Sequence, residues 1–474
     1  MQILNFRQLA TRSALLLSLG LTVGACNKAV NIEPTTQISS DKGFTTKEDA
    51  AAGLLGAYDA VQATDYEGLA YPTDVDLIAR EIRHVGTFVT TLGVIGDNQV
   101  TPDNIQVGNT WNAIYVAISR VNYLLQQSDK IADPAFPKLT TQGEARALRA
   151  FHYMNLLAMW GGSTLGYGYP NGVGVPLRLA PTTAIGPETA AVPRSSEAEV
   201  ATAIRADLDF AVANLPTGAG GNRLTKNSAL ALRARFELRM RNYADALMYA
   251  QQVPAIGGFA TSALTGTTAP DAIWQLFFSN TDQNLYAFYW YPAPGGRNEL
   301  DPGSSIAAAH PTGDRRLPIN VVSAPTTVTV NGSLFNLSAG TTQKYYRTST
   351  RDDRPNLVRY AEVVLTIAEA AAQTGDLTTA RTNLNIIRAR AGLSPKPIST
   401  SAAAIITDIL LQRRLELAYE GHYWFDLRRT NTVQSALGSP GTPNAYNQTF
   451  RNLFPIPLRE VQLTNNLIVQ NDGF

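Results

Sequence analysis

An aromatic run bounded by turn-forming residues is the part of this sequence best suited to binding a sugar. Residues 286–291 read Tyr-Ala-Phe-Tyr-Trp-Tyr, and a proline and a glycine pair follow. Sugar recognition uses aromatic faces that stack on the apolar C–H faces of a ring, and polar side chains that replace water at its hydroxyls. If the run is instead a strand that fills the core, its alternate residues lie on opposite faces. The candidate ligand-binding residues here are Tyr289, Trp290, Tyr291, Arg297 and Asn298.

A second candidate stretch, residues 65–84, mixes aromatic, acidic and basic side chains without a stable period. Such a mixture favours an irregular segment, and binding residues are common on exposed segments of that kind. Its candidate ligand-binding residues are Tyr66, Tyr71, Asp74 and Arg80. By contrast, helical spacing or an apolar neighbourhood predicts a core position for Trp111, Trp160 and Trp274.

The sequence lacks the spacings that metal or nucleophilic chemistry requires. Its four histidines are scattered, and Asp74 and Asp76 supply too few oxygen ligands for a calcium loop. Neither a phosphate-binding glycine loop nor a Gly-x-Ser-x-Gly turn occurs. The paired acids of a glycosidase can be distant in the chain, but nothing favours any one pair. We therefore expect a binding protein and not an enzyme, with no metal and no cofactor.

A charge-dense segment, residues 413–428, resembles a catalytic site only superficially. Arg413 and Glu416 are three residues apart, and Glu416 and Glu420 are four apart. These spacings favour ion pairs along or between helices. The same interpretation applies to a second set of charged residues inside apolar helical segments, which comprises Glu362, Glu369, Arg388 and Arg390.

The amino terminus predicts export and lipid anchoring. Two basic residues, Arg7 and Arg12, precede a short apolar run, and small residues lead directly to Cys26, the only cysteine of the 474 residues. This order is typical of a secretory signal, and the run is shorter than the roughly 20 residues that cross a bilayer. A cysteine placed after small residues resembles a bacterial lipobox, which implies a signal peptide over residues 1–25 and acyl chains on Cys26. The alternative is an ordinary secreted protein with a chance cysteine.

Composition places the rest of the chain among globular proteins. Charged residues make up 16% and nearly cancel, with 39 basic and 38 acidic side chains, so no nucleic-acid partner is expected. Residues 26–44 are polar and predict a tether that holds the body near the membrane surface. We expect residues 45–474 to form a single domain.

Helical periodicity dominates that domain, so we predict a mainly α fold. The segments 106–128, 143–160 and 196–215 carry apolar stripes, and the last opens with a capping box at Ser196-Glu197-Ala198-Glu199. Two helix pairs, near 231–250 and 365–384, share a turn, a cap and small residues, and resemble tetratricopeptide repeats. Irregular insertions are expected near residues 65–105, 161–195 and 257–350, with short strands at 325–337.

Several phrases of the carboxyl-terminal half resemble one family. They are Asn356–Leu365 with Ala368-Glu369-Ala370, Leu384–Leu393, Arg413–Arg429, Phe454-Pro455-Ile456-Pro457 and the final Gln470–Phe474. Earlier, Gly143–Phe151 and Arg205–Leu208 add to the likeness. Together they resemble the SusD/RagB family of Bacteroidetes outer-membrane lipoproteins, from the lipobox to the last residue. Gln412 and Tyr423 depart from the family pattern, where a glutamate and an arginine are usual.

The resemblance implies a cell-surface, lipid-anchored protein of the outer membrane that binds an oligosaccharide nutrient. It also implies a partner, a SusC-like TonB-dependent β-barrel transporter over which the protein acts as a lid. Two alternatives stay open. One is a binder of peptides or another nutrient with the same fold, and the other is a surface scaffold or adhesin that uses its helical repeats.

Overall fold

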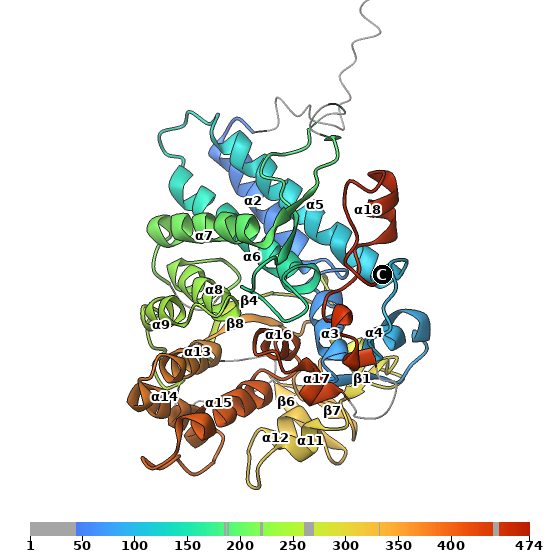
Figure 1. Ribbon diagram of the computed structural model, residues 1–474, viewed down its shortest axis with the longest axis vertical. Helices are drawn as coiled ribbons and strands as arrows, with labels where there is room; N and C mark the ends of the chain where they lie inside the picture. The colour runs from blue at the N-terminus through green and yellow to red at the C-terminus, as the bar shows by residue number, and fades with distance from the viewer. Residues whose placement is uncertain are drawn as a thin grey trace, which may run out of the picture.

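A computed structural model describes residues 44–183, 186, 189–218, 221–259, 270–330, 332–438 and 445–474. Helices dominate these residues, and the described strands are short, so the predicted mainly α fold is confirmed. Cys26, the predicted signal and all of the predicted tether except Phe44 lie outside the described residues. The long helices gather in two groups, one at each end of the view in Figure 1.

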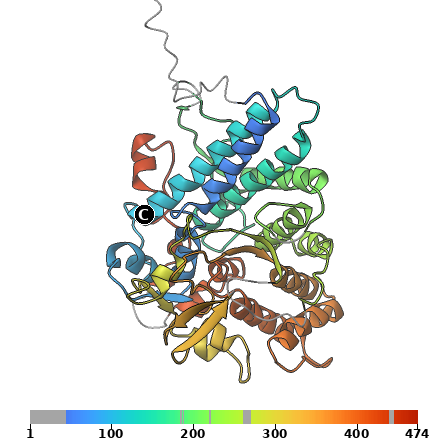
Figure 2. The same cartoon turned by 180° about the vertical axis from the view of Figure 1, so that it is seen from behind.

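The first group consists of long helices packed side by side: α2 (Lys47–Gln62), α5 (Ile105–Ser128), α6 (Lys138–Trp160) and α7 (Glu197–Asn214). Figure 2 shows the slanted packing of α2 against α5 from behind. Thr46, Asn104 and Ser196 cap the first turns of α2, α5 and α7, and the capping box predicted at Ser196 is confirmed. Trp111 and Trp160 meet edge to face inside this group, as their spacing predicted.

The second group contains the two predicted helix pairs. They are α8 (Lys226–Arg239) with α9 (Tyr243–Gln251), and α13 (Tyr360–Gln373) with α14 (Leu377–Arg390). Helix α13 packs on α8 and α9, and α15 (Ala402–Glu416) packs on α13 and α14. Small buried residues at the contacts, Ala246, Ala368, Ala370 and Ala380, allow the helices to approach closely. The tetratricopeptide-like stacking inferred from the sequence is therefore present, although more than 100 residues separate the two pairs.

Buried ion pairs hold this group together, which confirms the structural interpretation of the charged residues. The carboxylate of Glu369 accepts hydrogen bonds from both terminal nitrogens of Arg429, and Glu362 forms an ion pair with Arg235. Glu416 accepts from Arg390 at 2.7 Å in the same interior. Coulombic attraction to the guanidinium groups of Arg390, Arg359 and Arg316 lowers the pKa of Glu416 to about 2 and outweighs the opposing effect of burial.

Four small antiparallel sheets occur among the described residues, and two of them join segments that are distant in the sequence. In order, β1 (Ile82–His84) pairs with β5 (Leu300–Pro302), β2 (Val173–Pro176) with β3 (Arg194–Ser196), β4 (Ala272–Gln275) with β8 (Asn356–Arg359), and β6 (Thr326–Val330) with β7 (Ser333–Leu337). The last pair lies in the region where short strands were predicted. The β1–β5 pair matters most below, because it brings two candidate ligand-binding segments together.

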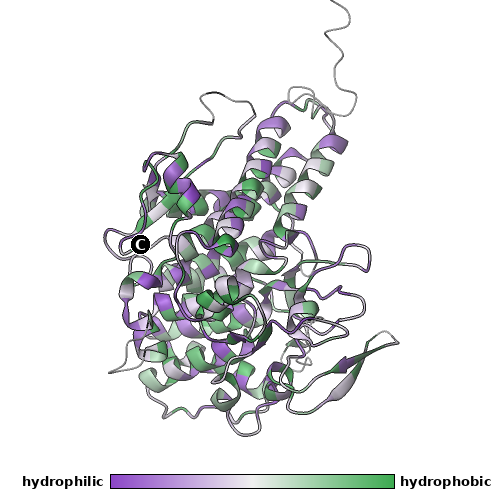
Figure 3. Ribbon diagram, turned by 90° about the vertical axis from the view of Figure 1, so that its right-hand side faces the viewer, coloured by the Kyte–Doolittle hydropathy of each residue, from purple (hydrophilic) through white to green (hydrophobic). Residues whose placement is uncertain are grey.

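Short helices complete the described elements: α3 (Ala70–Ile78), α4 (Val94–Gly96), α10 (Tyr286–Trp290), α11 (Ile306–Ala309), α12 (Leu317–Asn320), α16 (Tyr423–Arg429), α17 (Val433–Leu437) and α18 (Leu458–Leu463), with the π-helix η1 (Val89–Gly93) and the 3₁₀ helices η4 (Ala445–Asn447) and η5 (Thr449–Asn452). Hydrophobic and hydrophilic residues alternate along the helices, as amphipathic packing requires (Figure 3). Within the described ranges, no helix combines the length and apolar character that a bilayer crossing needs.

Candidate ligand-binding site

The candidates between residues 65 and 84 were expected on the surface, and the structure corrects this expectation for Tyr66, Tyr71 and Asp74. All three are buried. The Tyr66 hydroxyl lies 3.0 Å from Nδ1 of His152, and the Tyr71 hydroxyl donates to the carbonyl of Asn155. The physical reason is that α3 is covered by α5, α16 and β1, so its polar side chains bond inward. In this arrangement they present no face to a ligand.

Arg80 is exposed, but it stands apart from the other candidates. Its guanidinium lies over the ring of Tyr446, 4.5 Å from the ring centroid. The residue has a positive φ of 56° in the turn that follows α3. Arg80 therefore packs on the carboxyl-terminal segment of the chain.

The aromatic run forms the helix α10 and not a strand, and this decides which rings are exposed. A helix places residues four apart on one face, so Tyr286 and Trp290 both turn into the core. Trp290 packs against Tyr419, and the hydroxyl of the buried Tyr291 donates to Thr342 O at 2.7 Å. The expectation that Trp290 and Tyr291 are available to a ligand is therefore wrong for this conformation.

Tyr289 remains half-exposed and stacks on a ring that the sequence analysis did not select. The rings of Tyr289 and Phe88 lie 6.0 Å apart between centroids, with planes 22° from parallel. The exposed Arg297 covers the Phe88 ring at 4.1 Å, and Arg351 covers Phe288 at 4.7 Å. We call Phe88, Phe288, Tyr289, Arg297 and Arg351 the aromatic surface. Asn298 lies in the turn beside it, half-buried, with its side-chain amide 3.4 Å from Asp301.

The carboxylate of Glu299 fixes the position of Phe88. It is fully buried and accepts hydrogen bonds from the backbone N–H groups of Thr87 at 2.8 Å and Phe88 at 3.3 Å. Nε2 of His84 lies 3.2 Å away, and Nε of Arg297 lies 2.6 Å away. Pairing of His84 with Leu300 in the β1–β5 sheet places these groups around the carboxylate.

The same contacts explain the electrostatics and the sequence of this turn. Burial alone would raise the pKa of Glu299, but the donors from Phe88, Thr87 and His84 outweigh it and lower the pKa. Glu299 is therefore an anion at neutral pH. A side chain at Gly86 would place its Cβ 2.0 Å from the Glu299 carboxylate, so only glycine fits there.

A hollow of about 390 Å³ lies between α2, α5 and the segment 278–283, and none of the five residues of the aromatic surface lines it. Asp65, Arg120 and Phe278 are among its lining residues. Burial raises the pKa of the Tyr289 phenol, and the carboxylates of Glu299 and Asp65 add to the shift. The phenol stays protonated and able to donate a hydrogen bond. The surface thus offers flat rings, donors and acceptors together, the combination that sugar recognition uses.

Metal chemistry finds no support in the same region. Across the residues that the structure describes, no group of three or more histidine, cysteine, aspartate or glutamate side chains could hold a metal ion. The acids near the aromatic surface are already engaged, since Glu299 accepts from several donors and Asp301 pairs with Arg83.

The fold is that of a helical-repeat scaffold protein, and the aromatic surface lies on its inserted segments. Residues 322–474 match the family model described as SusD family, and residues 38–238 match one described as starch-binding associating with outer membrane. The chain belongs to the SusD/RagB family.

Relatives of known sequence and structure agree over nearly the whole chain. SusD-like protein P38 of Formosa agariphila is 26% identical over 92% of this chain and 93% of its own length. SusD-like protein P2 of the same organism is 24% identical over 96% of this chain and 98% of its own length. A SusD superfamily protein from Bacteroides fragilis has a similar fold, with a TM-score of 0.75 and 22% identity. The match covers 90% of this chain and 100% of that protein's chain. A laminarin-binding SusD-like protein matches with a TM-score of 0.70, 21% identity and coverage of 91% and 100%.

Proposed function

We propose that this protein is a non-enzymatic, surface-anchored binding protein that captures oligosaccharides and delivers them to a SusC-like TonB-dependent transporter. The observation that carries the proposal is the stacked pair of Phe88 and Tyr289, two partly exposed rings whose segments are brought together by the β1–β5 sheet. The description of the amino-terminal family model and the laminarin-binding relative support a glycan as ligand.

In this proposal the sugar ring lies against the aromatic surface with its C–H face on Tyr289, which Phe88 holds in place by stacking. Arg297 and the Tyr289 hydroxyl donate to the sugar hydroxyls at the edge of the surface, and Asp65 accepts from them. A ring face that covers about 60 Å² of sugar contributes about 1.5 kcal/mol at about 25 cal/mol per Å². Such a site binds weakly, which suits a protein that must release its cargo into a transporter.

Calorimetry with a panel of neutral oligosaccharides tests the proposal. The panel includes fragments of laminarin and starch, and the protein is the full mature chain. We expect Tyr289→Ala and Phe88→Ala each to weaken binding about tenfold, the equivalent of about 1.4 kcal/mol. Phe450→Ala is the matched control, because Phe450 is a half-buried ring under Arg451 at another site. Binding of peptides only, or equal binding by all variants, contradicts the proposal.

Anchoring through Cys26 is a separate part of the proposal. Lipid on this residue would leave the body in water beside the outer membrane, within reach of a barrel partner. Mass spectrometry of the mature protein should show an acylated amino-terminal cysteine, and Cys26→Ser should release the protein from the membrane fraction. Co-purification of a TonB-dependent barrel with the anchored protein tests the partner. Turnover of any bound saccharide by the pure protein would contradict its non-enzymatic role.

A further inference from the structure

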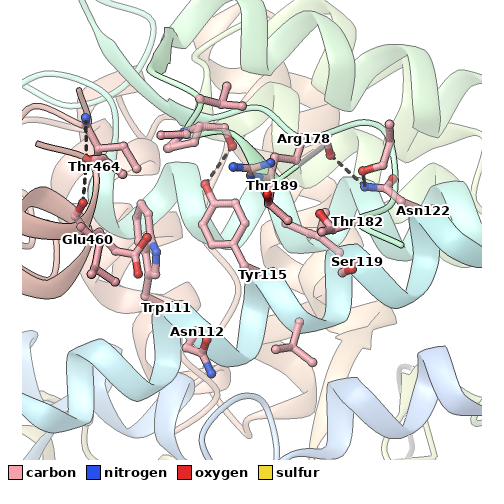
Figure 4. A pocket seen from close by; sticks show the side chains of 18 residues that line it. Trp111, Asn112, Tyr115, Ser119, Asn122, Arg178, Thr182, Thr189, Glu460 and Thr464 are labelled. Atoms are coloured by element: carbon pink, nitrogen blue, oxygen red, sulfur yellow. Dashed lines mark hydrogen bonds between the residues drawn. The ribbon is translucent and has the colours of Figure 1, made fainter. Parts of the chain in front are cut away.

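A second cavity, of about 460 Å³, lies between α5, the segments 176–182 and 189–192, and α18 (Figure 4). Its volume falls within the range of about 300 to 1,000 Å³ that is usual for small-molecule sites. None of the residues of the aromatic surface lines it. Two of its lining residues, Asn112 and Val116, also line the hollow that contains Asp65, so these two cavities are neighbours across the exposed edge of α5.

The wall of this cavity is rigid, because helical spacing and tertiary contacts fix its side chains. Trp111, Tyr115 and Ser119 are four residues apart on α5 and therefore share one face. Trp111 is held edge to face against Trp160, and the Tyr115 hydroxyl donates to Pro176 O at 2.8 Å. The side-chain amide of Asn122 donates to the carbonyl of Arg178 at 3.0 Å and fixes the opposite segment.

Several polar groups at this wall have no protein partner. Among the described residues, the carboxylate of Glu460 accepts no hydrogen bond and forms no ion pair, although it lies at the cavity beside Trp111 (Figure 4). The indole N–H of Trp111 and the hydroxyl of Ser119 likewise have no hydrogen-bond partner within the described part of the chain. Polar groups that line a partly enclosed cavity without partners are free to bond a ligand.

The charges at the cavity nearly balance, which selects against a charged ligand. Burial raises the pKa of Tyr115, Glu460 adds to the shift, and the guanidinium groups of Arg178 and Arg194 oppose it. Both signs of charge therefore face this ring. The remaining wall is apolar, with Val192, Leu463 and Ile468 at the α18 side.

We infer that this cavity is a second saccharide-binding site, distinct from the aromatic surface, that takes a short neutral sugar. Glu460 accepts hydrogen bonds from ring hydroxyls, the Trp111 N–H and the Ser119 hydroxyl donate to sugar oxygens, and the Tyr115 ring and the apolar wall contact the C–H face. The ligand class rests on the proposed function, whereas the location rests on the unpartnered groups and the shared edge of α5.

The test separates the two sites by removing one at a time from the full mature chain. In a Phe88→Ala/Tyr289→Ala background, saturation-transfer NMR and calorimetry with laminarin-derived and starch-derived oligosaccharides should still detect binding. Glu460→Gln in that background should weaken this residual binding about tenfold, because glutamine lacks the charge that strengthens the hydrogen bonds from the sugar hydroxyls. Glu48→Gln, the same change at an exposed position of α2, is the matched control and should have no effect.

Each outcome decides between the sites. Residual binding that falls with Glu460→Gln, and also with the cavity-filling Ser119→Trp, supports the inference. Loss of all binding in the Phe88→Ala/Tyr289→Ala background overturns the second site and leaves the proposed function intact. Wild-type affinity in that background, together with loss in Glu460→Gln, overturns the role of the aromatic surface and leaves the cavity. Residual binding that neither cavity variant changes also overturns the inference, provided that thermal melts show all variants folded.

Discussion

Replacing Glu299 by glutamine should disable the aromatic surface without changing any residue that contacts ligand. The carboxylate accepts from two backbone N–H groups, from His84 and from Arg297 while fully buried. Glutamine keeps one acceptor oxygen but turns an NH₂ group toward donors. The substitution therefore removes at least two charge-assisted hydrogen bonds.

The magnitude follows from those contacts. Hydrogen bonds to a charged group contribute about 1.5–3 kcal/mol each and do not add fully, so we expect a loss of about 3 kcal/mol at this turn. The turn that carries Thr87 and Phe88 can open by itself, so most of this loss should appear as local opening, with only a small change in melting temperature. Phe88 then loses its fixed position, and saccharide affinity should fall about tenfold, as expected for Phe88→Ala.

Calorimetry for affinity and hydrogen exchange at residues 84–89 provide the assay. Asp301→Asn is the matched control, because Asp301 lies two residues after Glu299, in strand β5, but pairs with Arg83, whose side chain is 59% exposed. An exposed pair of this kind contributes about 0–1 kcal/mol, so binding should be almost unchanged. Wild-type saccharide affinity and wild-type hydrogen exchange in Glu299→Gln would refute the reasoning. An equal loss of affinity in Asp301→Asn would show that the Glu299 carboxylate has no special role.

The remaining predictions concern the same turn, its titration and the scaffold. Gly86→Ala should weaken saccharide binding, because its Cβ would lie 2.0 Å from the Glu299 carboxylate; unchanged calorimetry would contradict this. Since the pKa of Glu299 is lowered in the folded state, its stabilisation is complete above the unfolded pKa of about 4.3 and is lost as the pH falls through the folded value. Saccharide affinity measured by calorimetry at a series of pH values should therefore stay constant near neutral pH and decline only in acid. A decline near neutral pH would contradict this role of the ionised Glu299. Glu362→Gln should destabilise the fold by about 3–5 kcal/mol in urea unfolding, because it leaves Arg235 buried without its partner; a change below about 1 kcal/mol would contradict this.

The scaffold was predictable from the sequence because its signals are local. A capping box at Ser196 and a repeated turn-and-cap pattern both depend on residues a few positions apart, and both are confirmed. The ion pairs of the motif helices were inferred from charged residues inside apolar stripes, and the structure shows them buried.

The candidate site was less predictable because exposure depends on tertiary contacts. Over five residues, an aromatic run fits a strand or a helix, and only the helix α10 turns Trp290 inward while Tyr289 stays at the surface. Phe88 had a weak local signal, a lone ring between Gly86 and Gly93 in an insertion. The role of Phe88 depends on its contacts with Tyr289 and Glu299. These residues lie about 200 positions away in the sequence, and the β1–β5 sheet brings their segment next to Phe88.

The bond between Thr87 and Glu299 joins residues that are 212 positions apart, and this separation has a consequence for folding order. Closing so long a chain segment costs entropy that only the assembled helices can offset. The ligand-recognition face should therefore form after the helical frame, and mild denaturant should abolish recognition while the helices persist. Newly synthesised chains would acquire their helical frame first and their selectivity last.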